Sequence, residues 1–517
     1  MQDIKELVLL LEQHGLDLFQ QPPPNFKENA ALIQLYTSVR KGDNNSDVAA
    51  FAGNIPGASP ATSVALQQLK NTLRTELIQL IGQYNTDLEQ HTDPGKALFE
   101  CEKQWLTVRR FTGQNAGSLT LSLGNQLFRI AQKFEYTKLC ADISAFLRIQ
   151  FCLRRHDNDA DCAKAIKHYQ YYRKMYDIEF QAEDRYTMLN RLSANGRKDQ
   201  KKISALARKA YTDLQGPMRR YPSGKLHLYG YLIKILGHMG DSDYPAVLRI
   251  CTKAIRFFEN KPYHAQDPLQ VFYYMQLIAN IQLRRFAAGE KSVRQCLERA
   301  TTGTFNWFKF QELFLMLMLH TGRFSQATAF IKTIGAYPKF SDLSVHILDN
   351  WRVYERYLNV LNNTGSDRKT AAQQIENLQQ ILNLPTNSIE RPGVTTAGIF
   401  AGFSELLQQG NLNELNQYAG LVSEYTERFL NQQNTRRSYY FSKMLQQIQT
   451  GNFDRESITK ATAGYLKKLK SVTLQVAYQI DEMEILPYEM LWEINLNMLE
   501  KRFRAQTATA VSGATFK

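Results

Sequence analysis

The sequence predicts an all-α protein, an irregular α–α hairpin solenoid with an N-terminal helical cap. Three observations support this fold class. Apolar residues recur at helical spacing in one segment after another, prolines number only 15 in 517 residues, and strand-like alternation is almost absent. The chain is also longer than the roughly 250–300 residues that one compact core supports, so we expect several domains or an extended repeat array.

Residues 1–93 are expected to form the N-terminal helical domain. A short helix near residues 4–11 precedes a run of three prolines at 22–24, which forces a loop, and a second helix carries residues 32–39. A long helix over 63–84 then aligns leucines along one side. These leucines are Leu66, Leu69, Leu73, Leu77 and Leu80.

From residue 94 onward the expected pattern is helix, short break, helix. We expect hairpin repeats at 94–365, further hairpin repeats at 366–504 and a disordered tail at 505–517. The clearest repetition lies in three helix pairs whose starts are roughly 35–45 residues apart, the period of two-helix repeats. The pairs are 225–239 with 245–258, 269–284 with 287–300, and 307–320 with 325–334. Helices are also expected at 97–111, 119–133, 136–155, 162–176, 183–192, 201–214, 343–361, 371–384, 399–408, 413–429, 435–449, 455–469 and 487–504, and residues 472–480 as helix or extended linker.

The segment HTGRFSQATAFIKTI resembles the middle of a tetratricopeptide repeat. Gly322, Phe324 and Ala327 fit the glycine, the aromatic and the small residue that let two helices pack closely, and Gly451 with Phe453 repeats the Gly-x-aromatic element. Most other segments match in period alone. The resemblance implies a tetratricopeptide-like superhelix with degenerate repeats, and such arrays bind peptides or proteins on a concave face or serve as structural hubs.

Positive charge is concentrated in one part of the chain. The net charge is +14, and residues 151–230 carry 17 Lys/Arg against nine Asp/Glu. Such cations, with tyrosines interleaved, can bind nucleic acid or an acidic protein, while a solvated helix face produces the same pattern. The candidate binding residues are Arg197, Lys198, Lys201, Lys202, Arg208, Lys209, Arg219, Arg220 and Lys225.

The alternative to a protein-binding scaffold is a nucleic-acid-binding or transcription-regulatory protein. Residues 46–53, a loop and a helix beginning near residue 61 resemble a helix-turn-helix in outline. Residues 1–100 carry seven Lys/Arg against 12 Asp/Glu, and this acidic balance opposes DNA binding at that end. The second helix would offer Gln67, Gln68, Asn71 and Arg74 to base edges.

No metal, cofactor or enzymatic activity is expected. Cys152, His156, Cys162 and His168 combine zinc-type ligands, but their spacing matches no common zinc module. The acidic turn at 157–161 imitates the start of a calcium loop and lacks the required Gly and Glu, so its acids are expected to end one helix and cap the next. The sequence contains no phosphate-binding loop, dinucleotide fingerprint, nucleophile elbow or metalloprotease motif.

The cysteines and the apolar runs bear on location. Six cysteines without a C-x-x-C pair are expected to be reduced thiols. The longest apolar stretch, Leu313–Leu319, is far below the roughly 20 residues that span a bilayer, and the N-terminus does not resemble a signal peptide. The sequence therefore predicts a cytoplasmic, non-enzymatic helical-repeat scaffold that binds a protein or peptide partner without inserting into a membrane.

Overall fold

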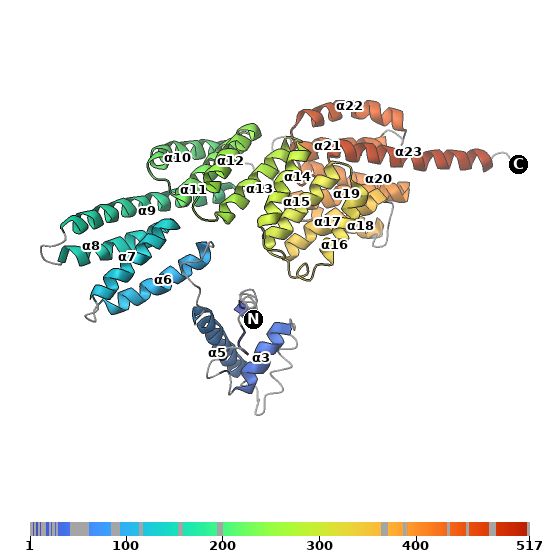
Figure 1. Cartoon of the computed structure of the whole chain (residues 1–517). Coiled ribbons are helices and arrows are strands. Elements are labelled where there is room, and N and C mark those ends of the chain that lie inside the picture. The colour runs from blue at the N-terminus through green and yellow to red at the C-terminus, as the bar shows by residue number, and fades with distance from the viewer. Residues whose placement is uncertain are drawn as a thin grey trace. The chain divides into compact units, whose positions relative to one another are not determined.

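The structure is a computed structural model of the chain, and its described part is all-helical, without a strand (Figure 1). The fold class predicted from the sequence is confirmed at this level. The described residues are 4, 7–8, 11, 17–19, 22, 26, 29–41, 62–83, 94–112, 117–153, 159–193, 200–362, 371–385, 389, 391–431, 435–450, 454–474 and 482–513.

The chain divides into two compact units, residues 1–106 and 107–517. The first unit contains α3 (Ala30–Lys41), α5 (Thr62–Gln83) and most of α6 (Pro94–Phe111). Helix α5 turns its leucines inward as expected, because Leu73 and Leu77 are fully buried together with Leu35 and Tyr36 of α3. The face of α5 opposite these leucines is exposed.

The second unit contains the remaining helices, and consecutive helices pack against each other along most of the chain. In chain order these helices are α7 (Gly117–Lys133), α8 (Thr137–Leu153), α9 (Asp159–Ser193), α10 (Gln200–Arg220), α11 (Gly224–Met239), α12 (Tyr244–Glu259), α13 (Gln266–Gln282), α14 (Phe286–Arg299), α15 (Phe305–His320), α16 (Phe324–Gly335), α17 (Val345–Asn362), α18 (Ala371–Leu382), α19 (Pro392–Gln409), α20 (Leu412–Phe429), α21 (Arg436–Thr450), α22 (Arg455–Ser471) and α23 (Tyr488–Gly513).

Four of the turns between helices share one backbone geometry. Glu135, Ser242, Arg284 and Gly322 each adopt a left-handed conformation, with φ of 59°, 58°, 56° and 73°. In every case the next residue donates its N–H to the carbonyl five positions earlier, which closes the helix end in a Schellman-type turn. The bonds, at 2.8–3.0 Å, are Tyr136 to Ala131, Asp243 to His238, Arg285 to Asn280 and Arg323 to Met318.

These matching turns show that four pairs of consecutive helices are joined in the same way. Only one of the four left-handed positions is a glycine, which is why the sequence resemblance is clear at Gly322 and faint elsewhere. Phe324 begins α16 directly after this turn, and Ala327 is fully buried where α15 and α16 meet. The second Gly-x-aromatic element, at residues 451–453, lies outside the described residues.

Several helix boundaries differ from those expected. The helices predicted at 162–176 and 183–192 are one continuous α9, because the intervening residues 177–182 contain neither glycine nor proline. Helix α10 continues through Pro217 to Arg220, and α19 begins at Pro392, where a first-turn proline needs no N–H partner. Helix α23 runs to Gly513 and so overlaps the segment predicted as a tail, and most of 472–480 lies outside the described residues.

No helix in the described part of the chain is long and apolar enough to cross a membrane. The second unit is instead held together by a large buried cluster that spans α13 to α23, and by smaller clusters around α9 to α13.

Candidate functional site

The basic residues predicted from the sequence gather on the solvent-facing side of α10. Helix α10 buries Ile203, Ala207 and Leu214 on its inner side. Its outer side carries six exposed cations in two adjacent rows. One row holds Lys201, Arg208 and Arg219, and the other holds Lys202, Lys209 and Arg220. We call these six residues the α10 basic face.

The two rows follow from helix geometry. Separations of seven and 18 residues correspond to nearly two and to five turns of about 3.6 residues, so the members of one row lie above one another. Residues 201–220 extend over about 30 Å at 1.5 Å per residue. The α10 basic face is therefore an elongated cationic strip, of a shape suited to an extended acidic segment rather than to a single small anion.

Most of the charge on this strip is not neutralised within the described part of the chain. The only acid of α10, Asp213, is paired with Arg185 of α9 at 3.3 Å. Lys201, Lys202, Lys209 and Arg219 have no ion-pair partner among the described residues. These four side chains are the strongest candidates for contact with an acidic partner.

The other predicted basic residues are engaged or undescribed. Arg208 pairs with Asp241, and Arg220 lies over the ring of Tyr221 at 5.8 Å. Lys225, on α11, binds Glu183 at 2.8 Å, and its hydrogen bond lowers the pKa of that carboxyl. Arg197 and Lys198 lie outside the described residues. The nine predicted residues therefore do not form one uniform patch.

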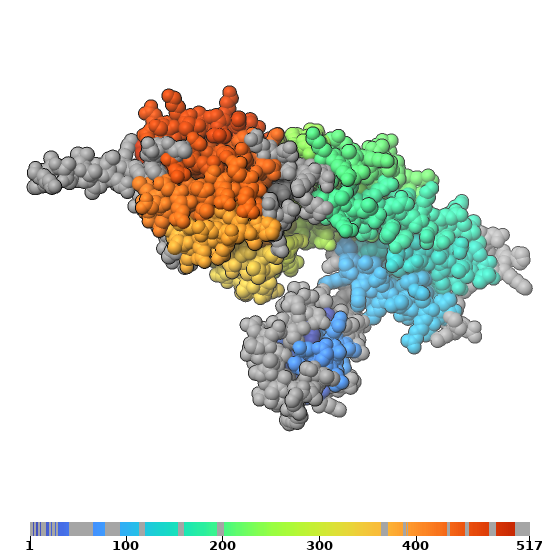
Figure 2. All heavy atoms as spheres, turned by 180° about the vertical axis from the view of Figure 1, so that it is seen from behind, coloured from blue at the N-terminus to red at the C-terminus, as the bar shows by residue number. Residues whose placement is uncertain are grey.

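Helices α12 and α14 expose further cations. They are Arg249, Lys253 and Arg256 on α12, and Lys291 and Arg294 on α14. Figure 2 shows the green part of the chain, which includes α10 and α12, at an open surface of the second unit. The candidate binding residues predicted from the sequence end at Lys225, and exposed cations continue beyond it on these two later helices.

A second feature, not expected from the sequence, is a buried non-helical segment that leads into the first residue of α23. We call residues 482–488 the C-terminal strap, and every one of them is buried. Tyr488 stacks on Phe441 of α21 at 4.6 Å and meets Phe400 of α19 edge-on at 5.5 Å. The backbone carbonyl of Glu484 lies 3.2 Å from Nε2 of His320, at the end of α15. The strap thus joins helices that are far apart in the sequence.

Arg437 of α21 holds the strap in place, and its side chain is only 1% exposed. Its Nε and Nη2 atoms donate to the two carboxylate oxygens of Glu484 at 2.7 Å, and Nη2 also donates to Glu489 at 2.6 Å. Nη1 donates to the carbonyls of Leu469 and Val472 at 2.9 and 2.8 Å. All five N–H donors of this guanidinium are therefore used.

The strap and α23 pack against α19, and the strap also contacts the C-terminal end of α15. Most side chains of both helices are buried, the polar Glu312 of α15 and Glu405 of α19 included. Sequence reasoning missed this arrangement because it depends on contacts such as His320 with Glu484, which are 164 residues apart. The local signal that was present is the run of acidic and apolar residues in 482–486, outside any helical pattern.

The structure rearranges the candidate metal ligands. Cys152 and Cys162 form a disulfide between the end of α8 and the start of α9, so the prediction of six reduced thiols is wrong for this pair. The other four cysteines are free and buried. His168 stacks on Phe128 at 5.1 Å, and His156 lies outside the described residues, as do Asp157 and Asn158 of the acidic turn. No group of three or more potential metal ligands occurs among the described residues.

The helix-turn-helix prediction can be followed only in its second helix. Gln67, Gln68, Asn71 and Arg74 are all exposed on α5, on the face opposite the buried leucines. The first helix of the predicted motif, at residues 46–53, lies outside the described residues.

No protein-family model, no curated protein and no solved structure matches this chain.

Proposed function

We propose that this chain is a non-enzymatic scaffold of tetratricopeptide-like helical hairpins, arranged as a superhelix, that binds an acidic segment of a partner protein. The four matching turns at Glu135, Ser242, Arg284 and Gly322 support the repeat architecture. The observation that carries the binding proposal is the α10 basic face, an exposed strip of six cations. Four of them have neither an ion pair nor a ring contact among the described residues, whereas Arg208 pairs with Asp241 and Arg220 lies over Tyr221.

The C-terminal strap favours a binding surface on the outer side of the helices. In the C-terminal half, a concave inner groove is less accessible to a partner. A helical-repeat protein can use the inner side of its helix rows as a peptide groove, but the strap and α23 already pack against α19. A partner would have to displace Tyr488 and the buried Arg437–Glu484 pair to reach this side of α19. Exposed cations need no such displacement, since their side chains already face solvent.

A protein partner is favoured over nucleic acid by the lack of stacking groups on the strip. Binding of single strands combines phosphate contacts with exposed aromatic side chains that stack on bases. On α10 the aromatic Tyr211 is half-buried and lies 4.6 Å below the ammonium group of Lys234, so its ring is already occupied. The α10 basic face therefore offers charge without a stacking platform.

Cytoplasmic location remains a prediction. The four buried free cysteines favour a reducing compartment, whereas the Cys152–Cys162 disulfide is more typical of an oxidising one. The absence of enzymatic activity is likewise part of the proposal.

The test is affinity purification of the full chain from its native cell, followed by mass spectrometry. The variant replaces Lys201, Lys202, Lys209 and Arg219 by Glu. The matched control replaces four exposed lysines of α22, which changes the net charge by the same amount. These control positions are Lys460, Lys467, Lys468 and Lys470.

We expect the α10 variant to lose acidic proteins that the wild type and the α22 control both retain. Retention of the same proteins by all three chains would contradict the proposal. Nuclease treatment separates the two functions, because a protein contact survives it. Loss of the bound material after nuclease, with a steep fall in binding between about 50 and 200 mM salt, would instead establish the nucleic-acid function.

A further inference from the structure

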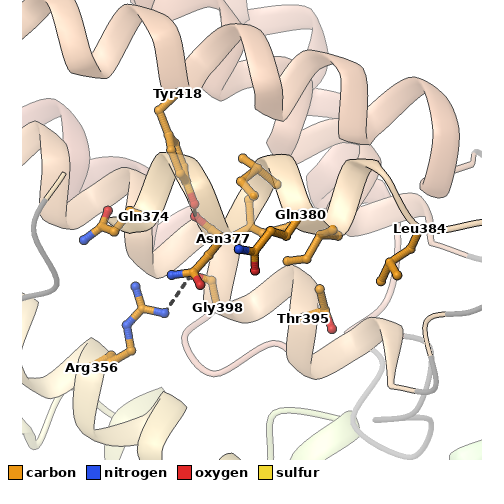
Figure 3. Close-up of a pocket in the computed structure, with 11 residues that line it drawn as sticks. Arg356, Gln374, Asn377, Gln380, Leu384, Thr395, Gly398 and Tyr418 are labelled. Atoms are coloured by element: carbon orange, nitrogen blue, oxygen red, sulfur yellow. Dashed lines mark hydrogen bonds between the residues drawn. The ribbon is translucent and has the colours of Figure 1, made fainter. Parts of the chain in front are cut away.

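A pocket of about 490 Å³ opens between α17, α18, α19 and α20 (Figure 3). Among these four helices, α18 packs chiefly against α20, and α17 chiefly against α19. Its size lies within the roughly 300–1,000 Å³ of small-molecule sites. The pocket is separate from the α10 basic face, so what it binds is a question apart from the proposed function.

The pocket has a polar end and an aliphatic end. In Figure 3, Arg356, Gln374 and Asn377 lie together at one end, and Leu384 lies at the other. Leu378, Ile381 and Ile399 complete the aliphatic lining. A ligand that fits must therefore carry a hydrogen-bonding group on one side and an aliphatic group on the other.

The polar end carries no net charge. Arg356 of α17 binds Glu405 of α19 through two parallel hydrogen bonds of 2.9 and 2.8 Å. Gln374 of α18 donates to the same carboxylate at 2.7 Å. A carboxylate ligand would lie close to Glu405, and an ammonium ligand close to Arg356. Both charged ligands are therefore disfavoured relative to a neutral one.

The same end retains free donors and acceptors. Arg356 has five N–H donors, of which three are used, by the two bonds to Glu405 and one of 3.1 Å to the carbonyl of Gly398. Within the part of the chain that the structure describes, one N–H on each terminal nitrogen has no acceptor. The half-buried side-chain amide of Asn377 makes no hydrogen bond within the described part of the chain. It offers both an acceptor oxygen and a donor nitrogen.

We propose that this pocket binds an uncharged amide that carries an aliphatic group. The amide carbonyl accepts from the free N–H groups of Arg356, and the amide N–H donates to the side-chain oxygen of Asn377. The aliphatic group packs on Leu378, Ile381 and Leu384. Two kinds of ligand combine an uncharged amide with an aliphatic group. One is an aliphatic residue within a peptide, and the other is a small acyl amide.

The test titrates the full chain at pH 7 with three derivatives of leucine that differ in charge and share its side chain, using ligand-observed saturation-transfer NMR. The probes are N-acetyl-leucine amide (neutral), N-acetyl-leucine (anionic) and leucine amide (cationic). We expect the neutral probe to bind about tenfold or more tighter than either charged probe, the equivalent of about 1.4 kcal/mol. Hexanamide is the fourth probe. Tighter binding of N-acetyl-leucine amide identifies a peptide source, and tighter binding of hexanamide identifies a small acyl amide.

Two variants locate the binding. Asn377→Leu removes the free amide and favours helix, and Gly398→Leu projects a side chain into the pocket, where a Cβ at position 398 meets only Nη1 of Arg356 at 3.6 Å. Each should weaken binding of the neutral probe about tenfold. Asn413→Leu and Gly420→Leu make the same changes at exposed positions of α20 outside the pocket and should have no effect.

Equal binding of neutral and charged probes would overturn the proposal. Unchanged binding in both pocket variants would also overturn it. So would the absence of binding by every probe to the folded full chain, since the pocket would then hold only water. None of these results depends on the α10 basic face, so they leave the partner-binding proposal intact. Conversely, the charge-reversed α10 variant should bind N-acetyl-leucine amide like the wild type.

Discussion

Replacement of Arg437 by Met should detach the C-terminal strap. The side chains of Arg437 and Glu484 are 1% and 4% exposed, so this pair is buried. Removal of one partner of a buried pair leaves the other charge without compensation, at a cost of about 3–5 kcal/mol. The replacement also leaves the carbonyls of Leu469 and Val472 without the donor that they share.

Hydrogen exchange read by mass spectrometry measures this effect locally, which suits a chain with two compact units better than one global unfolding curve. Arg437→Met should lower the free energy of opening of the strap by about 3–5 kcal/mol, which accelerates amide exchange there at least about a hundredfold. Addition of Glu484→Gln removes the uncompensated charge and should restore part of the loss. A recovery of stability in the double variant would show that the unpaired Glu484 carboxylate causes part of the destabilisation.

Arg455→Met is the control for Arg437→Met. Arg455 of α22 also bridges to α23, at Glu500 and Glu493, but its side chain is 38% exposed. Such a pair contributes only about 0–1 kcal/mol. If Arg437→Met costs no more than Arg455→Met, the strap is not held by its buried ion pairs, and the reasoning is refuted.

Three further predictions concern a turn, a buried histidine and the disulfide. Gly322→Ala should lower the free energy of unfolding by about 1–2 kcal/mol, because φ is 73° at this position. Gly464→Ala, in the open middle of α22, should raise it by about 0.5–1 kcal/mol. Equal changes of the two variants in urea unfolding would contradict the left-handed turn. Burial lowers the pKa of His320 to about 4, below its unfolded value, and Nδ1 has no acceptor among the described residues although Arg284, Arg437 and Glu489 lie near. The unfolded chain therefore binds the proton first, and stability should fall by about 3 kcal/mol as the pH drops from about 6.5 to 4, a loss that should be absent in His320→Gln. Alkylation of the unfolded, unreduced chain should label the four free cysteines, and labelling of Cys152 and Cys162 as well would disprove the disulfide.

The spacing of apolar residues along the sequence is enough to predict the helices. Where the observed helix boundaries and turns differ from the prediction, the cause is local. Helical spacing of apolar residues placed nearly every helix because each must bury one side. The turns at Ser242 and Arg284 were not recognised as equivalents of Gly322, since their left-handed geometry is adopted by residues that rarely show it. Helix α9 is continuous where the sequence predicts two helices, because residues 177–182 contain no glycine or proline to end the first.

The candidate sites differ in how far they could be predicted. The α10 basic face was found from charge alone, because exposed cations on one helix need no distant partner. The engagement of Arg208 by Asp241 and of Lys225 by Glu183 could not be predicted, since each pair joins different helices or turns. The strap and the pocket depend entirely on such long-range packing. Side chains as far apart in sequence as Arg356 and Glu405 meet only in the folded chain.

Site-specific photocrosslinking from α10 in the native cell tests the central proposal most directly. A photoreactive amino acid at Ala205, an exposed position between the two rows of cations, should crosslink to an acidic protein, and the crosslink should vanish when Lys201, Lys202, Lys209 and Arg219 are replaced by Glu. The same group at Ala461, exposed on α22, should not capture that protein. Capture of the same species from both positions, or of nucleic acid alone from Ala205, would contradict the proposal that the α10 basic face binds a protein partner.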